Sequence, residues 1–389
     1  VDRLATPMRG RMIHDRSGRI TLQPYGYKEY ETLYSVRRES LQQCLLYEAA
    51  NSERIRIHFN HRLREIDWDQ KTALFSTSEN GDGHSHTFEV LIGADGPASK
   101  VRRLMGSVCD LDADVKMLNS GYKYLSIPAD ENHEPLMDPN ALHIWPRGGY
   151  MMLAFAGPDG SFTATLFLPL KGDHRMIWGF EELDSWTRQR AFMEANFPDV
   201  SPLIPRLEEE FRENHVGRMG TVRCKQWHHR GDALLIGDAA HAIVPFHGQG
   251  VNSALEDCTT LDSILNDNPA SWEAVFQALQ DRRKENTDAI ADMALDAYRT
   301  MRESVRHRDF LLRKALEREL ELRHPDRFVA RYSLVMFHRI PYTEAVERGR
   351  VQGEILDRLL EGKEELTDVD LQLAARLVGE RLREVSAIQ

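Results

Sequence analysis

The sequence is poor in cysteine and lacks the spacings of cysteine and histidine that bind a structural metal. Its 389 residues contain four cysteines, which lie far apart and form no Cys-x-x-Cys pair. The adjacent histidines His228 and His229 have no acidic or cysteine partner at ligand spacing. Zinc sites and disulfide scaffolds both need closely grouped side chains of these types. We therefore expect no metal site, and four reduced thiols in a cytoplasmic protein.

The sequence also lacks long apolar runs and an excess of basic residues. No stretch reaches the roughly 18 apolar residues that a membrane-spanning helix needs, because Asp238 and His241 interrupt the most apolar region, residues 233–246. Acidic residues number 61 and basic residues 50, so the net charge is -11. Such a charge repels nucleic-acid phosphates and anionic lipid surfaces. We therefore expect no nucleic-acid partner and no membrane anchor.

Apolar patterning in the first third of the chain indicates alternating strands and helices. Strands are expected at residues 11–14, 20–22, 55–59 and 72–76, with a helix at 40–50. Residues 88–94 form a nearly continuous apolar run, typical of a strand covered on both faces, and residues 233–236 form a second one. This pattern predicts an α/β domain with a parallel sheet.

The rest of the chain has a different pattern. Short strands separated by turn signals are expected at residues 122–127, 142–145, 150–155 and 162–168, which indicates an antiparallel sheet. From Asn252 onward the sequence reads as almost wholly helical. We predict an α/β plus antiparallel β fold: a Rossmann-like domain from residues 1–106 and 221–268, an antiparallel-sheet domain at 107–220, and a helical region at 269–389.

The strongest functional signal is an ordered series that begins at Gly237-Asp238 and continues through Gly248 and Gly250 to Asn252. A buried strand delivers Asp238 to its carboxyl end, where a carboxylate can accept a hydrogen bond from a ribityl or ribose hydroxyl. Gly248 and Gly250 let the backbone approach a planar ring or a phosphate, and the next helix offers free N–H groups. The series predicts a cofactor-binding ledge, because an ordinary Gly-Asp turn would explain only its first dipeptide.

This series resembles the flavin-binding motif of the class A flavoprotein monooxygenases, the group typified by para-hydroxybenzoate hydroxylase. Residues 92–102, which contain Asp95-Gly96, resemble the motif that serves FAD and NADPH in the same group. Asp95-Gly96 alone would more often be a turn, but the two motifs occur in the family's order. The resemblance implies an FAD-binding domain and a separate substrate domain.

A closer resemblance, to the kynurenine 3-monooxygenase family, extends through Arg350. It rests on residues 8–14, 24–26, 35–39, 58–63, 142–146 and 162–169. It implies a substrate-contacting segment near residues 8–25, in which Arg11 and Tyr25 hold a carboxylate. A guanidinium can donate two charge-assisted hydrogen bonds to a carboxylate, and a phenol adds a neutral one. The alternatives are a surface salt bridge for Arg11 and a core position for Tyr25.

The same resemblance implies the other site residues. Tyr332 matches a second substrate tyrosine, and Pro245, Phe246 and His247 would line the cavity before the flavin ring, although His247 could equally be a hydrogen-bonded core histidine. The residues implied in flavin binding are Arg38, Leu63, Asp95, Asp238, Gly250, Val251 and Asn252. Arg38 suits a pyrophosphate, but could also be an exposed arginine at a helix start. We expect a structural role for His241.

Two features depart from the family pattern. The family begins with a strand, a Gly-x-Gly-x-x-Gly turn and a helix that cradle the flavin pyrophosphate, and no such turn precedes Arg9. The sequence therefore predicts an incomplete first βαβ unit, an apolar edge on the strand that ends at Gly93, and weak FAD binding. The family also has asparagine at Ala297 and glutamate at Thr300. Alanine cannot form a side-chain hydrogen bond, so we expect an altered amino-acid end of the substrate pocket.

These observations together predict a flavoprotein monooxygenase. The resemblance implies FAD as cofactor, NADPH as reductant, dioxygen, and a small aromatic amino-acid-like substrate, L-kynurenine, that becomes 3-hydroxykynurenine. No catalytic protein nucleophile is expected, because the flavin performs the oxygen chemistry. Two alternatives stay open: hydroxylation of another tryptophan-derived or anthranilate-like acid, and a non-catalytic fragment with impaired FAD binding. The sequence predicts neither the oligomeric state nor the choice between NADPH and NADH.

Overall fold

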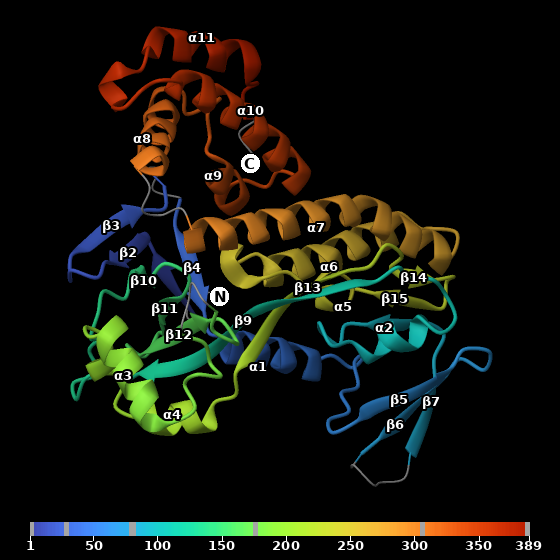
Figure 1. Ribbon diagram of the computed structural model, residues 1–389. Coiled ribbons are helices and arrows are strands. Elements are labelled where there is room, and N and C mark those ends of the chain that lie inside the picture. The colour runs from blue at the N-terminus through green and yellow to red at the C-terminus, as the bar shows by residue number, and fades with distance from the viewer. Residues whose placement is uncertain (1–3, 27–30, 78–82, 174–177, 304–307, 386–389) are drawn as a thin grey trace. The chain divides into compact units, whose positions relative to one another are not determined.

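The computed structural model describes residues 4–26, 31–77, 83–173, 178–303 and 308–385. The chain forms two compact units (Figure 1). The first unit contains residues 1–45, 118–219 and 299–389, and the second contains residues 46–117 and 220–298. Each unit has its own sheets and its own apolar core.

A seven-stranded sheet is the centre of the first unit, with the strand order β13-β9-β12-β11-β10-β2-β3. The strands are β2 (Gly10–His14), β3 (Ile20–Pro24), β9 (Asp114–Ile127), β10 (Ala141–Pro146), β11 (Met151–Ala156), β12 (Phe162–Leu168) and β13 (Gly217–Arg223). Antiparallel pairing joins β10 to β11, β11 to β12 and β12 to β9. Large apolar residues such as Trp145, Met152 and Phe162 are almost wholly buried on these strands, so burial on one face holds the sheet in register.

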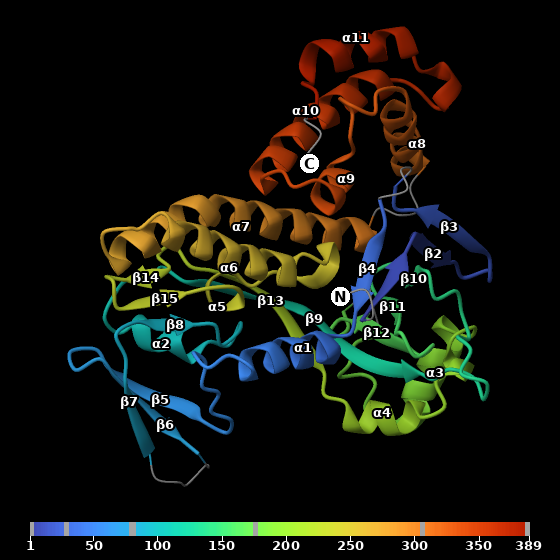
Figure 2. The same ribbon diagram turned by 180° about the vertical axis from the view of Figure 1, so that it is seen from behind.

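Helices α3 (Trp186–Asn196) and α4 (Leu207–Glu213) cover one face of this sheet, as Figure 1 and Figure 2 both show. Phe192 and Phe211 of these helices share an apolar core with Trp145 and Phe162 of the strands. Burying a large apolar side chain contributes roughly 1.5 to 3 kcal/mol. This packing makes the middle of the chain an independent core.

Strand β2 enters the same sheet from far away in the sequence. It pairs in parallel with β10 and antiparallel with β3. Nearby, β1 (Ala5–Met8) and β4 (Leu33–Val36) form a two-stranded antiparallel sheet, and α1 (Arg38–Ala50) follows. Residues near 8–25 therefore belong to the antiparallel-sheet unit.

The C-terminal part of the first unit is helical. Its helices are α8 (Arg308–Arg323), α9 (Arg331–Phe337), α10 (Tyr342–Leu360) and α11 (Leu371–Arg381). Leu316, Phe328, Ile355 and Val378 form a separate apolar core among them. The predicted helical C-terminal region is confirmed.

The second unit is built on a three-stranded sheet in the order β14-β15-β8. Its elements are β8 (Leu91–Gly93), α2 (Lys100–Met105), β14 (His228–His229), β15 (Ala233–Leu235), α5 (Asp238–His241), α6 (Gly250–Asn266) and α7 (Trp272–Glu303), the last of which ends in the first unit. Strands β15 and β8 are parallel. Strand β8 lies at the sheet edge, where the side chain of Ile92 is 42% exposed.

A second, antiparallel sheet in this unit contains β5 (Arg62–Asp67), β6 (Thr72–Ser76) and β7 (Gly83–Thr87). The main core of the unit lies between the β14-β15-β8 sheet and the helices, where Leu234, Met105 and Phe276 are fully buried. Strands β15 and β8 are parallel and their last residues, Leu235 and Gly93, pair with each other. The two predicted motifs, which follow these strands, therefore begin side by side at the carboxyl ends of the strands.

The predicted fold class is confirmed, but several details differ. Residues 55–59 form no strand, because they lie in an exposed loop, and the strand predicted at 88–94 is limited to Leu91–Gly93. Residues 1–45 are assigned to the same unit as the antiparallel sheet, since β2 pairs with β10. Residues 269–298 belong to the second unit instead of the helical C-terminal region.

Candidate active site

The predicted Gly-Asp motif forms a tight turn after β15. Gly237 has φ 56° and ψ -142°, a left-handed conformation that favours glycine. Its carbonyl accepts hydrogen bonds from the backbone N–H groups of Ala240 and His241. These bonds form α5, whose first residue, Asp238, is exposed. The turn thus presents a carboxylate at the carboxyl end of a parallel strand, where α/β sheets commonly bind ligands.

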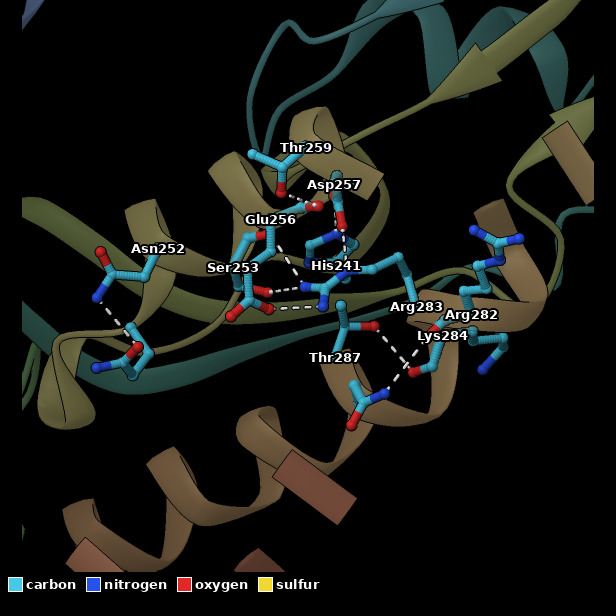
Figure 3. Close-up of polar contacts among 12 residues, drawn as sticks. His241, Asn252, Ser253, Glu256, Asp257, Thr259, Arg282, Arg283, Lys284 and Thr287 are labelled. Atoms are coloured by element: carbon cyan, nitrogen blue, oxygen red, sulfur yellow. Dashed lines mark hydrogen bonds and ion pairs between the residues drawn. The ribbon is translucent and has the colours of Figure 1, made fainter. Parts of the chain in front are cut away.

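A buried polar network lies behind this turn (Figure 3). Asp257 of α6 is 0% exposed. Its carboxylate accepts hydrogen bonds from the Gly237 N–H at 2.9 Å, from His241 Nε2 at 2.6 Å and from Arg283 Nε at 2.9 Å. Burial opposes ionisation of Asp257, but the bonds from His241, Gly237 and Arg283 outweigh it and hold its pKa below the usual value. His241 also stacks on Trp227, with 4.8 Å between ring centroids, so the expected structural role of His241 is confirmed.

The start of α6 supplies a second exposed surface. Gly248 has φ 67°, and no heavy atom lies within 4 Å of a Cβ placed there. Two residues later α6 begins with Gly250, followed by Val251, whose side chain is 56% exposed, and by the exposed Asn252. Asn252 Nδ2 donates to Gln249 Oε1 at 3.0 Å. An apolar and an amide side chain side by side at a helix N-terminus suit a planar ring that carries polar atoms.

Residues Pro245–His247 form the short turn η2 before this helix. Phe246 and His247 are buried and Pro245 is exposed. The Phe246 ring packs on Tyr298 of α7, with 4.7 Å between centroids. Tyr298 directly follows Ala297, so the expected cavity residues and the position that departs from the family are neighbours in the second unit.

Asp95 caps a helix. Its carboxylate accepts hydrogen bonds from the Ser99 hydroxyl and from two backbone N–H groups at the start of α2. The buried Arg102 then donates to the carbonyls of Ala239 at 2.7 Å and Pro97 at 2.6 Å. Arg102 thereby fastens the Asp-Gly segment to α5. A direct flavin contact for Asp95 stays a prediction.

Two other predicted flavin residues lie on different elements. Leu63 of β5 is half-buried against the core of the second unit. Arg38 is the first residue of α1 and is exposed, whereas its neighbour Arg37 is held by Asp159 at 2.6 Å. The roles of Leu63 and Arg38 stay predictions.

The three predicted substrate residues Arg11, Tyr25 and Tyr332 come together in the first unit. Arg11 lies on β2, Tyr25 directly follows β3 and Tyr332 lies on α9. The Cζ atom of Arg11 lies 5.2 Å from the ring centroid of Tyr25 and 4.4 Å from that of Tyr332. The two rings are nearly parallel, 6.1 Å apart. Both contacts have cation–π geometry, so the tyrosines hold the guanidinium in place.

The electrostatics of this cluster favour an anionic ligand. Burial raises the pKa of both Tyr25 and Tyr332, so both phenols stay protonated and able to donate. Burial by itself would lower the pKa of Arg11, but the two tyrosines outweigh it and the pKa is raised. Arg11 is half-buried, and within the described part of the chain no acidic side chain forms an ion pair with it. The described residues therefore do not support the alternative that Arg11 forms a surface salt bridge.

Comparison with known proteins places the chain in a family. Residues 19–273 match the FAD binding domain family. The chain is 41% identical over 378 residues to kynurenine 3-monooxygenase of Myxococcus xanthus, covering 97% of this chain and 80% of that protein. It is 40% identical over 366 residues to kynurenine 3-monooxygenase of Stenotrophomonas maltophilia, covering 94% and 79%. The chain belongs to the kynurenine 3-monooxygenase family.

Solved structures agree with the fold expected for a member of the kynurenine 3-monooxygenase family. The tetrameric form of 2-methyl-3-hydroxypyridine-5-carboxylic acid oxygenase matches with a TM-score of 0.59 at 20% identity, covering 80% of this chain and 78% of that chain. The tetracycline destructase Tet(51) matches with a TM-score of 0.55 at 16% identity, covering 86% and 80%. At such identities the likeness shows a shared fold.

Membership in the kynurenine 3-monooxygenase family makes the chain a flavoprotein monooxygenase that uses FAD, with NADPH as the typical reductant of that family. The second unit has features that fit FAD. Asp238 offers an exposed carboxylate, and the open space at Gly248 leaves room for close approach of a ring.

The structure of this kynurenine 3-monooxygenase family member adds two further observations. Among the described residues, no helix has both the length and the apolar composition that crossing a membrane requires. In the same residues, no three histidine, cysteine or acidic side chains are grouped so as to hold a metal ion.

Sequence reasoning missed the charged residues behind the site, namely Asp257, Arg283 and Arg102. A signal for one of them exists. The buried residues of α6 are Ser253, Asp257 and Ile264, whose spacing places them on one helix face. An aspartate on the buried stripe of a helix needs a buried partner, but the sequence does not reveal which one.

Proposed function

We propose that the chain hydroxylates the aromatic ring of L-kynurenine to 3-hydroxykynurenine, with FAD, NADPH and dioxygen. The observation that best supports this proposal is the half-buried Arg11 guanidinium held by Tyr25 and Tyr332. A substrate with a carboxylate and an aromatic body matches this cluster, because the guanidinium binds the anion and the rings pack on apolar surface. The relatives at 40% and 41% identity are named for the reaction on kynurenine.

In this proposal the substrate and the cofactor are held by separate sets of residues. Arg11, Tyr25 and Tyr332 hold the substrate carboxylate, and Pro245, Phe246 and His247 line the cavity that receives the ring. FAD, when bound, supplies oxygen activation and accepts reducing equivalents from NADPH. The residues assigned to FAD are Arg38, Leu63, Asp95, Asp238, Gly250, Val251 and Asn252. The protein itself binds, orients and excludes water.

The test is substrate-dependent turnover. Purified protein supplied with FAD and NADPH should consume NADPH faster when L-kynurenine is added, and 3-hydroxykynurenine should appear by mass spectrometry. Flavin-dependent NADPH oxidation without a hydroxylated product would contradict the substrate assignment. The absence of any flavin-dependent NADPH oxidation would favour the non-catalytic alternative.

A second candidate function is hydroxylation of another tryptophan-derived or anthranilate-like acid. Ala297 and Thr300 favour it, because both are half-buried on α7 and neither matches the family's asparagine and glutamate. Ala297 lies beside Tyr298, which packs on Phe246. Comparing the kcat/KM for kynurenine with those for related anthranilate-like acids separates the two candidates.

A cytoplasmic location is part of the same proposal. Cys44, Cys109, Cys224 and Cys258 are all free thiols, which suits a reducing compartment. Cell fractionation with antibody detection tests the location, and recovery of the protein outside the cytoplasmic fraction would contradict it.

A further inference from the structure

Two exposed surfaces of the second unit, Asp238 on α5 and Val251-Asn252 at the start of α6, each adjoin a residue that is hydrogen-bonded to one buried ion pair, Asp257 and Arg283. Asp257 accepts the N–H of Gly237, just before α5, and the Nε2 hydrogen bond of His241, the last residue of α5. A single carboxylate therefore clamps both ends of the four-residue helix that starts with Asp238.

The partner of Asp257 reaches the other surface. Arg283 of α7 donates through Nε to Asp257 at 2.9 Å and through Nη2 to the carbonyl of Ser253 at 3.1 Å. Ser253 lies in the first turn of α6, directly after Asn252. Arg283 also pairs through Nη1 with Glu256 at 2.5 Å. Figure 3 shows Arg283 extending toward Ser253, Glu256 and Asp257.

Burial makes these contacts rigid. Asp257 is 0% exposed and Arg283 7% exposed, so no water competes for their hydrogen bonds, and interactions in such a low-dielectric environment are strong. The turn also has little freedom of its own, because a Cβ at Gly237 would lie 3.1 Å from the Cβ of Ala254 on α6. Displacing α6 relative to the turn therefore requires breaking the hydrogen bonds that Asp257 accepts from Gly237 and His241.

We propose that Asp257 and Arg283 are positioning residues that hold Asp238 and the Val251-Asn252 surface in one fixed arrangement, and thereby set the affinity for FAD. The link to FAD rests on the proposed function, whereas the positioning itself does not. Neither residue touches the cofactor in this proposal. The charge pair fixes the position of the Asp238 carboxylate, which would bind the ribityl chain, relative to the start of α6, which would contact the flavin ring.

The test uses the full chain and two readouts. Asp257→Leu removes both acceptor oxygens at similar volume. Amide hydrogen exchange of the flavin-free protein, measured by mass spectrometry, should then accelerate in residues 237–241, because the Gly237 N–H loses its acceptor. The Kd for FAD, measured by quenching of flavin fluorescence, should rise roughly tenfold or more, the size of loss known for removal of the residues that orient metal ligands.

Glu256→Gln is the matched control. Glu256 is adjacent to Asp257 and also pairs with Arg283, but its side chain is 45% exposed. We expect normal exchange in residues 237–241 and less than a twofold change in the FAD Kd. If Asp257→Leu does not fold by circular dichroism, Asp257→Asn decides, because it keeps the side-chain volume but removes the charge that pairs with Arg283 and replaces one acceptor oxygen by an N–H donor group.

The outcomes separate the two parts of the inference. Exchange like that of the unmodified protein in a folded Asp257→Leu or Asp257→Asn variant would overturn the positioning role. Faster exchange with an unchanged FAD Kd would overturn the link to FAD while leaving the proposed reaction standing. If the unmodified chain shows no substrate-dependent NADPH oxidation but exchange is faster in the variant, the proposed function is contradicted and the positioning role is not.

Discussion

Arg11 shows how two neutral tyrosines can prepare a cation for a ligand. The rings of Tyr25 and Tyr332 lie at 5.2 Å and 4.4 Å from its Cζ atom, and their phenols stay protonated because burial raises their pKa values. The guanidinium is therefore held in place while its charge stays available. A carboxylate on such a group would accept two parallel hydrogen bonds.

We expect Arg11→Lys to weaken binding of the aromatic acid while leaving flavin content unchanged. Lysine keeps the charge but loses the planar fork, and a hydrogen bond to a charged group contributes about 1.5 to 3 kcal/mol. The KM for kynurenine should rise about tenfold or more. Arg9→Lys, an exposed position on the same segment, is the control and should behave as the unmodified chain does. Equal KM values for both variants would remove Arg11 from the site.

Ala297 allows a test of the substrate assignment itself. Restoring the family's residue with Ala297→Asn adds a side chain that can donate and accept hydrogen bonds. If the pocket is otherwise of the family type, the KM for kynurenine should fall several-fold, as one hydrogen bond contributes roughly 1 kcal/mol. A rise in KM through crowding would instead favour a substrate with a different amino-acid end. Steady-state kinetics with kynurenine and with an anthranilate-like acid give the comparison.

Strand β2 is an element whose position matters because it carries Arg11. Its last residue, His14, shares a hydrogen bond of 2.9 Å between its Nε2 and Nδ1 of His143 on β10. The Nδ1 atom of His14 lies 3.3 Å from the Asp199 carboxylate. Asp199 also accepts from Trp145 Nε1 at 2.7 Å. These contacts join β2, β10 and the loop after α3. They anchor the end of the strand on the sheet face that packs against α3.

The pH dependence of this anchor follows from Asp199. Burial opposes its ionisation, but the nearby His14 imidazole and the hydrogen bond from Trp145 outweigh burial and lower its pKa from 3.8 to about 2. Because folding lowers this pKa, the stabilisation is fully present above about pH 4 and is lost as the pH falls toward 2.

We therefore expect Asp199→Asn to lower the free energy of unfolding by about 1 kcal/mol at pH 7, a value reduced because the carboxylate is partly exposed. The difference from the unmodified chain should shrink as the pH falls below 4. Urea unfolding followed by tryptophan fluorescence at several pH values measures this. The surface variant Asp184→Asn, which removes an exposed ion pair, should show little change. A difference that is constant with pH would contradict the role assigned to the Asp199 charge.

At the scale of the whole molecule, the two units present different kinds of sheet. The larger sheet of the first unit has seven strands, whereas the β14-β15-β8 sheet of the second has three. Strand β8 lies at an edge of that sheet with Ile92 exposed. An apolar edge strand presents unpaired backbone groups and is a template for pairing with another chain.

We predict that Ile92→Lys reduces self-association of the purified protein, because a charge on an edge strand opposes edge-to-edge pairing. Static light scattering against protein concentration should show a smaller apparent mass or slower aggregation. Val115→Lys is the control, since Val115 is 49% exposed but lies on β9, which has neighbours on both sides in its sheet. Equal improvement in both variants would point to added charge in general and not to the edge of β8.

The sequence by itself determined the features that depend on local patterns. Strand β6 was predicted with its observed bounds, 72–76, and the helix at 40–50 was predicted within two residues of α1, because apolar period and turn residues are local signals. The Gly-Asp turn was also predictable, since a glycine in a left-handed conformation and an exposed carboxylate follow a buried strand. The family likeness supplied the residue roles.

Tertiary structure alone decided what depends on contacts between distant residues. The parallel pairing of β2 with β10 moved residues 1–45 into the antiparallel-sheet unit, and no local signal fixes a pairing over such a separation. The meeting of Arg11, Tyr25 and Tyr332 has the same origin, because these residues come from three elements. The buried pair of Asp257 and Arg283 was invisible for a related reason. A charged residue in sequence is ordinarily exposed, and only the packing of α6 on α7 removes these two from water.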